Sequence, residues 1–196
     1  MIVVLFGPPG SGKGTQAQRV ASLLEVPHVA TGDMLRAEVA RGSALGREAE
    51  PIMASGKLVP DDLIVRIIES RLQEPDAARG ALLDGFPRTL AQADALDAML
   101  ERRAWRVDVV VALRVSDDEL RRRVLRRGEI EGRADDNAEA IEQRLRTYRE
   151  QTAPVLDHYR ARQTRIAEVD GVGEIDAVTA RIAEALSADG AVVQAS

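Results

Sequence analysis

The chain has 196 residues, of which 45% are hydrophobic and 30% are charged, and its formal net charge is -5. These values suit one domain with a full core, and the negative charge argues against a general nucleic-acid-binding protein. The sequence contains no cysteine, which excludes disulfides and thiolate metal ligands, and it has no apolar run of about 18 residues, the length that a membrane span needs.

The first apolar run, IVVLF, follows Met1 directly, and no basic segment precedes it. We therefore expect no signal peptide and a cytoplasmic location. Along the chain, apolar runs alternate with segments of helical periodicity, which predicts an α/β fold with a parallel sheet. In chain order, the predicted elements are strand 2–6, helix 12–24, strand 28–30, a helix from residue 61, strand 81–84, helix 89–100, strand 107–113, a helix from residue 116, a long or broken helix 136–159, strand 165–169 and helix 174–186.

Polar residues and a proline mark some of the helix ends. Asp61 is predicted to cap the helix that it opens, and Thr89 with Gln92 has the T-x-x-Q pattern of a capping box. Pro154 lies inside the segment 136–159 and predicts a break there, because proline lacks the backbone N–H that a helix interior needs.

The stretch GPPGSGKGT, residues 7–15, nearly matches the phosphate-binding loop G-x-x-x-x-G-K-[ST]. A predicted strand leads into it and a predicted helix leads out, so consecutive backbone N–H groups can surround phosphate oxygens at the helix start. Lys13 is one of only two lysines in the chain, and a compact ammonium suits this position better than a planar guanidinium. The stretch therefore predicts a nucleotide-phosphate site.

The loop departs from the usual pattern at Gly14, where a Ser or Thr would bind Mg²⁺ directly. Thr15 does not replace that ligand, because one residue further along a helix is turned by about 100°. We expect Mg²⁺ to be held mainly by nucleotide oxygens and water, with Asp84 acting through water. The alternative for Asp84 is an Asx-turn before Gly85.

Seven motifs, counting this loop, stand in order along the chain. They are the extended loop GPPGSGKGTQ, then TGDMLR (31–36), GKLVPD (56–61), DGFPRT (84–89), GRADD (132–136), QRL (143–145) and RTYR (146–149). From residue 2 to about residue 186 the sequence resembles the adenylate kinase family. The resemblance implies a three-layer P-loop kinase fold with a five-stranded parallel sheet. It also implies Mg²⁺-dependent, reversible conversion of ATP and AMP into two ADP.

The resemblance also divides the chain, which we expect to be a single domain of residues 1–196. The core would comprise residues 1–29, 60–126 and 138–186, with a small helical subdomain for the nucleoside monophosphate (NMP) at 30–59 and a tail at 187–196. The lid, residues 127–137, would be very short, since only GEIEG lies between Arg127 and Arg133. We expect this segment to form a hairpin, and no structural zinc.

The resemblance also implies which residues bind the nucleotides, because the family's binding positions fall within the matching motifs. The positively charged ones suit phosphoryl transfer, in which the negative charge of the phosphates must be neutralised. The ATP side would comprise Gly10, Ser11, Gly12, Lys13, Gly14, Thr15, Arg123, Arg127 and Gly173. The AMP side would comprise Thr31, Arg36, Lys57, Leu58, Val59, Gly85, Phe86, Pro87, Arg88, Gln92, Arg133 and Arg144. The catalytic set would be Lys13, Arg88, Arg123, Arg133 and Arg144.

For several of these residues, a purely structural role remains an alternative to nucleotide binding. Arg36 and Arg88 could form local ion pairs, Arg144 could extend out from a core edge, and Gln92 could serve the capping box alone. His28 and His158 are read as structural.

The nearest alternative function is a UMP/CMP kinase, against which Thr31 argues by the same resemblance. A GTPase switch is disfavoured because its N-K-x-D motif is absent: the single asparagine, Asn137, precedes Ala138. No coiled coil or exposed apolar helix demands a partner chain, so a monomer with small-molecule substrates is expected.

Overall fold

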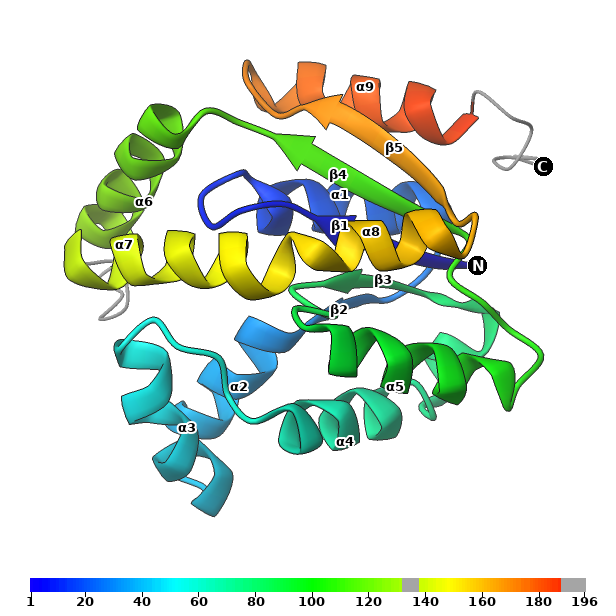
Figure 1. Ribbon diagram of the computed structural model, residues 1–196, viewed down its shortest axis with the longest axis horizontal. Helices are drawn as coiled ribbons and strands as arrows, with labels where there is room; N and C mark the ends of the chain where they lie inside the picture. Colours follow the sequence, from blue (N-terminus) through cyan, green and yellow to red (C-terminus); the bar gives the residue numbers. More distant parts are fainter. Residues whose placement is uncertain (132–137, 188–196) are drawn as a thin grey trace.

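The computed structural model describes residues 1–131 and 138–187 (Figure 1). Its centre is a five-stranded sheet with strand order β2-β3-β1-β4-β5, in which all neighbouring pairs are parallel. The predicted parallel α/β fold is confirmed, and only β4 begins later than expected. The strands are β1 (Ile2–Phe6), β2 (His28–Ala30), β3 (Ala81–Asp84), β4 (Val109–Arg114) and β5 (Arg165–Asp170).

Helices lie on both faces of this sheet. In chain order they are α1 (Lys13–Leu24), α2 (Thr31–Ala40), α3 (Ala44–Ala54), α4 (Asp61–Arg71), α5 (Leu90–Glu101), α6 (Asp117–Glu131), α7 (Ala138–Thr147), α8 (Pro154–Ala161) and α9 (Ile175–Ser187). A 3-10 helix, η1 (Pro75–Arg79), precedes β3, and a π-helical turn, η2 (Tyr148–Thr152), joins α7 to α8. Within the described ranges, no helix is both long and apolar enough to cross a membrane.

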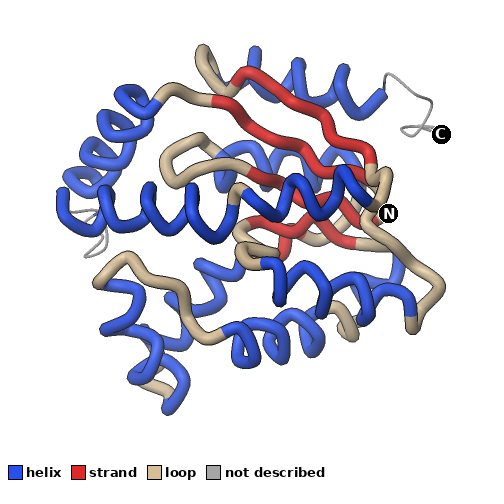
Figure 2. The backbone as a smooth tube through the Cα atoms, viewed as in Figure 1, coloured by secondary structure: helices blue, strands red, loops and turns tan. Residues whose placement is uncertain are grey.

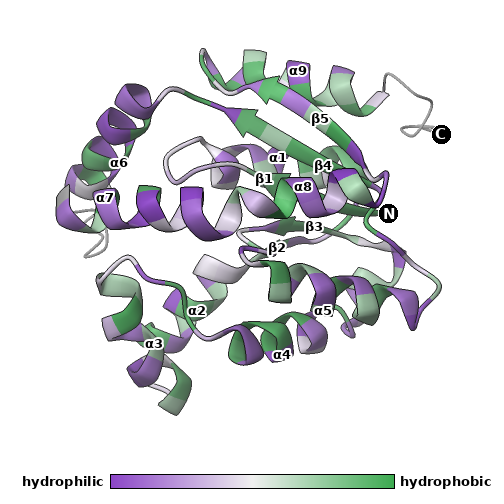
Figure 3. Ribbon diagram, viewed as in Figure 1, coloured by the Kyte–Doolittle hydropathy of each residue, from purple (hydrophilic) through white to green (hydrophobic). Residues whose placement is uncertain are grey.

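The alternation of side chains along β1 builds the three layers. Val3 and Leu5 pack with buried residues of α1 and α9, whereas Ile2, Val4 and Phe6 pack with those of α4, α5 and α8. Successive strand residues point to opposite faces, so a strand with helices on both sides is apolar throughout. The central strands are accordingly coloured hydrophobic in Figure 3, whereas most of α6 is hydrophilic.

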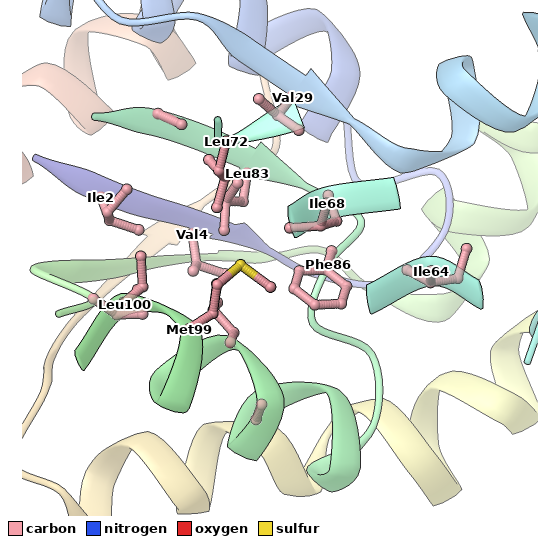
Figure 4. Close-up of a cluster of buried hydrophobic side chains, with 14 of the residues drawn as sticks. Ile2, Val4, Val29, Ile64, Ile68, Leu72, Leu83, Phe86, Met99 and Leu100 are labelled. Atoms are coloured by element: carbon pink, nitrogen blue, oxygen red, sulfur yellow. The ribbon is translucent and has the colours of Figure 1, made fainter. Parts of the chain in front are cut away.

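The larger core cluster lies between the sheet and α4, α5 and α8. Figure 4 shows Val4, Leu83, Ile68 and Met99 of β1, β3, α4 and α5 converging with Phe86 of the loop after β3. Each of these side chains is at most 3% exposed. Phe86 lies two residues after the end of β3, so its burial anchors the segment that leads from the sheet into α5. The core thereby fixes the position of the loop between β3 and α5.

The stretch from residue 31 to residue 54 forms two helices, α2 and α3, joined by a short turn, and they project from the sheet at lower left in Figure 1. The two helices approach closely at Gly46, where a Cβ atom would lie 2.2 Å from the backbone oxygen of Glu38. The helical content agrees with the expected NMP-binding subdomain. Its boundaries and movement stay predictions.

Three local expectations were wrong. Residues 128–131 continue α6 instead of forming a hairpin, because Glu129, Ile130 and Glu131 are all compatible with a helix. Asp61 is the first helical residue of α4, and the cap position belongs to Pro60. The last helix, α9, ends at Ser187, one residue later than expected. Residues 132–137, which hold most of the expected lid, lie outside the described part of the chain.

The expected break in the segment 136–159 occurs as a π turn. The backbone N–H of Ala153 donates to the carbonyl of Tyr148 at 2.7 Å, five residues back, and Pro154 then opens α8. Proline fits the first turn of a helix because no N–H is needed there. The chain therefore continues in nearly the same direction, with one wide turn at residues 148–152.

Candidate functional site

The loop between β1 and α1 is the tan segment that links these elements in Figure 2. Gly10 and Gly12 have φ angles of +82° and +92°, a left-handed region that glycine occupies without the Cβ clash of other residues. A Cβ on Gly10 would also lie 2.6 Å from Cγ2 of Val124 in α6. The loop therefore needs glycine for its backbone shape and for its contact with α6.

The ammonium of Lys13 lies in the bend of this loop. Its Nζ donates to the carbonyls of Gly7 at 2.7 Å and Pro8 at 2.9 Å. The pKa of Lys13 is lowered to about 7, mainly by burial. The negative charge of Asp84 opposes this shift, and the positive charges of Arg88, Arg144 and Arg127 add to it. The site thus concentrates positive charge, and an anion bound there would raise this pKa again.

Asp84 ends β3 beside α1, with its carboxylate directed towards His28. The Nε2 atom of His28 lies 3.3 Å from Oδ2 of Asp84. Burial alone would raise the pKa of Asp84, but the His28 hydrogen bond and the Lys13 charge hold it below its usual range. Within the described residues, His28 is the hydrogen-bond partner of this carboxylate, so the Asx-turn alternative is not realised.

A single ionised carboxylate suits Mg²⁺ that keeps most of its water and phosphate ligands. The nearest part of the loop is Gly14, where a Cβ would lie 3.7 Å from Oδ2 of Asp84. Asp84 therefore fits the expected role of a carboxylate that acts on the metal through water. His28, read from the sequence only as structural, is a neighbour of this carboxylate that sequence reasoning missed.

A hollow of about 590 Å³ lies between the loop after β3, α2 and the segment after α3. It brings together nine residues expected on the AMP side: Thr31, Arg36, Lys57, Leu58, Val59, Gly85, Arg88, Gln92 and Arg144. Phe86 and Pro87 do not line it, since Phe86 is 1% exposed and packed in the core, while Pro87 lines a neighbouring cavity with Lys13.

Two further hollows, of about 1490 Å³ and 830 Å³, follow the glycine loop. Both are lined by Gly10, Gly12, Thr15 and Arg127. The larger also holds Lys13, Gly14 and Asp84, and the smaller holds Ser11, Arg123 and Gly173. All the residues expected on the ATP side thus line these two hollows, which share lining residues and are together called the groove.

Arg88 and Arg144 line both the hollow of about 590 Å³ and the larger of the two hollows that follow the glycine loop. The Nε atom of Arg88 donates to the carbonyl of Gly85 at 2.7 Å, whereas Arg36 forms the local ion pair considered as its alternative, with Asp33 at 2.5 Å. Arg123 is held by Glu119 at 2.6 Å and by the carbonyl of Gly171 at 3.1 Å. Arg133 lies outside the described residues.

Gln92 is 2% exposed and has three structural hydrogen bonds. Its backbone N–H donates to Oγ1 of Thr89 at 3.1 Å, which confirms that part of the capping box. Its side-chain Oε1 accepts from the N–H of Arg88 at 2.7 Å, and its Nε2 donates to Asp61 at 2.7 Å. These bonds explain its burial, and an adenine contact stays a prediction.

Thr31 is 3% exposed, and its hydroxyl donates to the carbonyl of Gly85 at 2.9 Å. The bond links the start of α2 to the loop after β3. Two further side chains support that loop and had no sequence signal: Asp61, read only as a helix cap, and Thr152, which was not singled out.

Comparison with known proteins gives one consistent result. The sequence model of the family described as adenylate kinase matches residues 5–164. An adenylate kinase of Stenotrophomonas maltophilia (strain K279a) is 52% identical over 96% of this chain and 100% of that protein. Adenylate kinases of Phenylobacterium zucineum (strain HLK1) and Xanthomonas euvesicatoria pv. vesicatoria (strain 85-10) are 51% and 50% identical, over 95% of this chain and 98% and 99% of their own lengths.

Proposed function

This chain belongs to the adenylate kinase family, and we propose that its groove transfers the terminal phosphoryl group of ATP to AMP, giving two ADP in a reversible, Mg²⁺-dependent reaction. The observation that carries this proposal is that an acceptor hollow and a donor groove share Arg88 and Arg144 beside the ammonium of Lys13. Two facing nucleotides bring many negative charges together, and fixed cations at their junction offset that repulsion.

In the transfer, the bond between the γ-phosphorus of ATP and its bridging oxygen breaks, and a bond from that phosphorus to an oxygen of the AMP phosphate forms. Lys13 would bridge the ATP phosphates, while Arg88 and Arg144 hold the acceptor phosphate in line. Mg²⁺, when bound, neutralises charge on the phosphate oxygens. The ionised carboxylate of Asp84 would orient its water ligands.

The remaining donor contacts would come from two elements. The backbone N–H groups of the loop from Gly10 to Thr15 would surround the phosphates, as at other helix N-termini. Arg123 and Arg127 of α6 would lie along the nucleotide, and Gly173 would offer backbone near the base. Arg133 stays a predicted contact from the sequence alone, as do the monomeric state and the cytoplasmic location.

The choice of acceptor is tested by a direct competition among monophosphates. We expect ADP formation from ATP to be fastest, by kcat/KM, with AMP among AMP, GMP, CMP and UMP. A preference for CMP or UMP would overturn the AMP assignment in favour of a UMP/CMP kinase. A compound that joins two adenosines through phosphates should inhibit competitively against both ATP and AMP.

Replacing Gly14 with Ser tests how the metal is held. The new side chain has room, because a Cβ there makes only an ordinary contact with Asp84, and its hydroxyl restores the direct Mg²⁺ ligand of the usual loop. We expect the Mg²⁺ concentration for half-maximal rate to fall by about fivefold, the equivalent of one added polar contact. Gly14→Ala, which adds the same Cβ without a hydroxyl, is the control. Equal shifts in both variants would contradict this view of the metal.

A further inference from the structure

Both backbone polar groups of Arg88 are held by side chains from other parts of the chain. On one side, its N–H donates to Oε1 of Gln92 at 2.7 Å. On the other, its carbonyl accepts from the hydroxyl of Thr152 at 2.9 Å. Backbone groups outside regular structure are commonly satisfied by water, so two side-chain partners on one residue fix its position to an unusual degree.

Gln92 is itself oriented by Asp61. One carboxylate oxygen of Asp61 accepts from Nε2 of Gln92 at 2.7 Å, and the other accepts from the hydroxyl of Thr89 at 2.9 Å. An amide whose nitrogen is held by a carboxylate must present its oxygen on the other side, where it meets the N–H of Arg88. Asp61 thus selects the amide orientation that Arg88 requires.

Thr152 is 6% exposed and belongs to the π turn at residues 148–152. Such turns are rare and often occur at functional sites. Here the turn places Thr152 against the segment after β3, 64 residues away in the sequence. The hydroxyl therefore ties α7 and α8, which follow the predicted lid, to a residue of the acceptor hollow.

From this arrangement we propose that Thr152 and Asp61 are positioning residues that hold Arg88 from opposite sides in the geometry required for the acceptor phosphate. The inference rests on the proposed function, since it assigns Arg88 to that phosphate. Asp61 opens α4 two residues after the last of the acceptor-lining residues 57–59. The same carboxylate therefore links the end of the NMP-binding segment to Arg88.

The test begins with Thr152→Val, which keeps the shape of the side chain and removes its hydroxyl. We expect the KM for AMP to rise about five- to tenfold, while the KM for ATP changes less than about twofold. Thr152→Ser, which keeps the hydroxyl, should restore the KM for AMP. Asp61→Asn, which removes the charge that orients Gln92, should reproduce the Thr152→Val pattern and provides a second measurement if Thr152→Val fails to fold.

Thr147→Val is the matched control. Thr147 is 5% exposed and its hydroxyl accepts from Nε2 of Gln143 at 3.1 Å, so the variant removes a similarly buried hydroxyl in the same helical run. We expect it to lower the melting temperature without the selective rise in KM for AMP. A rise equal to that of Thr152→Val would overturn the proposal.

A double-mutant cycle shows whether Thr152 acts through Arg88. AMP affinity is measured by calorimetry on the full chain, with and without Arg88→Ala. We expect Thr152→Val to weaken AMP binding only when Arg88 is present. An equal loss in both backgrounds, or equal changes in the KM values of AMP and ATP, would reduce Thr152 to a structural role and overturn the proposal.

The proposed function is judged separately, on the wild-type protein. Failure of the wild type to phosphorylate AMP contradicts that function, whatever Thr152 does. The comparison of variants is then made with the monophosphate that the wild type accepts, since every such acceptor presents the same phosphate to Arg88.

Discussion

Lys13→Met is expected to lower kcat by about 10²- to 10³-fold, the range found when one preorganised donor to a reacting group is removed. The fold should persist, because methionine fills the space of the lysine stem without a polar atom. Steady-state transfer rates with ATP and AMP measure the loss. Arg66→Met, a change at an exposed side chain of α4 that pairs with Asp62, is the control and should keep the wild-type rate.

The same substitution is expected to stabilise the nucleotide-free protein. Burial lowers the pKa of Lys13 from 10.5 to about 7, so between these values the unfolded chain binds more protons than the folded one. The unfolding free energy of the wild type therefore rises with pH across this window. Below this pH window, Lys13 is charged in the folded protein, and burying that charge lowers the unfolding free energy by its full amount. Lys13→Met removes this loss.

Urea unfolding at a series of pH values measures this effect. The stability advantage of Lys13→Met over the wild type should be largest below about pH 7 and should shrink as the pH approaches 10.5. Saturating ATP should reverse the order of stability, since bound phosphate stabilises the wild-type ammonium. A constant difference at every pH would contradict the role of burial at Lys13.

Much of the fold follows from patterns that are local in sequence. The strands at residues 2–6, 28–30 and 81–84 were predicted with their observed bounds because an apolar run between polar turns has few other readings. The segment 128–131 differs from the expected hairpin, which rested on the short lid that the family resemblance implies, because its helix-compatible residues allow α6 to continue. The resemblance therefore gave the length of this segment but not its conformation.

The functional site likewise contains some residues that the sequence predicts and others that it does not. The glycine loop and Lys13 could be recognised because their chemistry is contained in nine consecutive residues. The partners of Arg88 could not, because Thr152 lies 64 residues away and reaches it through a π turn that has no sequence pattern. Similarly, His28 meets Asp84 only because β2 and β3 are paired, with Ala30 opposite Asp84. Long-range hydrogen bonds of this kind arise from the packing of elements, not from motifs.

Two glycines on opposite sides of the site are expected to give opposite kinetic defects when changed to alanine. Gly10→Ala places a Cβ 2.6 Å from Cγ2 of Val124, which pushes the donor loop away from α6. Gly85→Ala places a Cβ atom 2.6 Å from Nη2 of Arg88, which displaces the guanidinium from the proposed position of the AMP phosphate. We expect Gly10→Ala to raise the KM for ATP by about tenfold or more, and Gly85→Ala to do so for AMP.

A third glycine separates the clash from the backbone strain. Gly42 has a φ angle of +62°, and a Cβ there would meet no atom within 4 Å. Gly42→Ala therefore carries the cost of a left-handed alanine, about 1–2 kcal/mol, without any contact near the groove. It should lower the melting temperature and leave both KM values unchanged. If Gly10→Ala and Gly85→Ala behaved like Gly42→Ala, the two glycines would serve the backbone alone. A crossed pattern of KM changes would instead show that each position is glycine because a neighbouring side chain, Val124 at Gly10 and Arg88 at Gly85, needs the space.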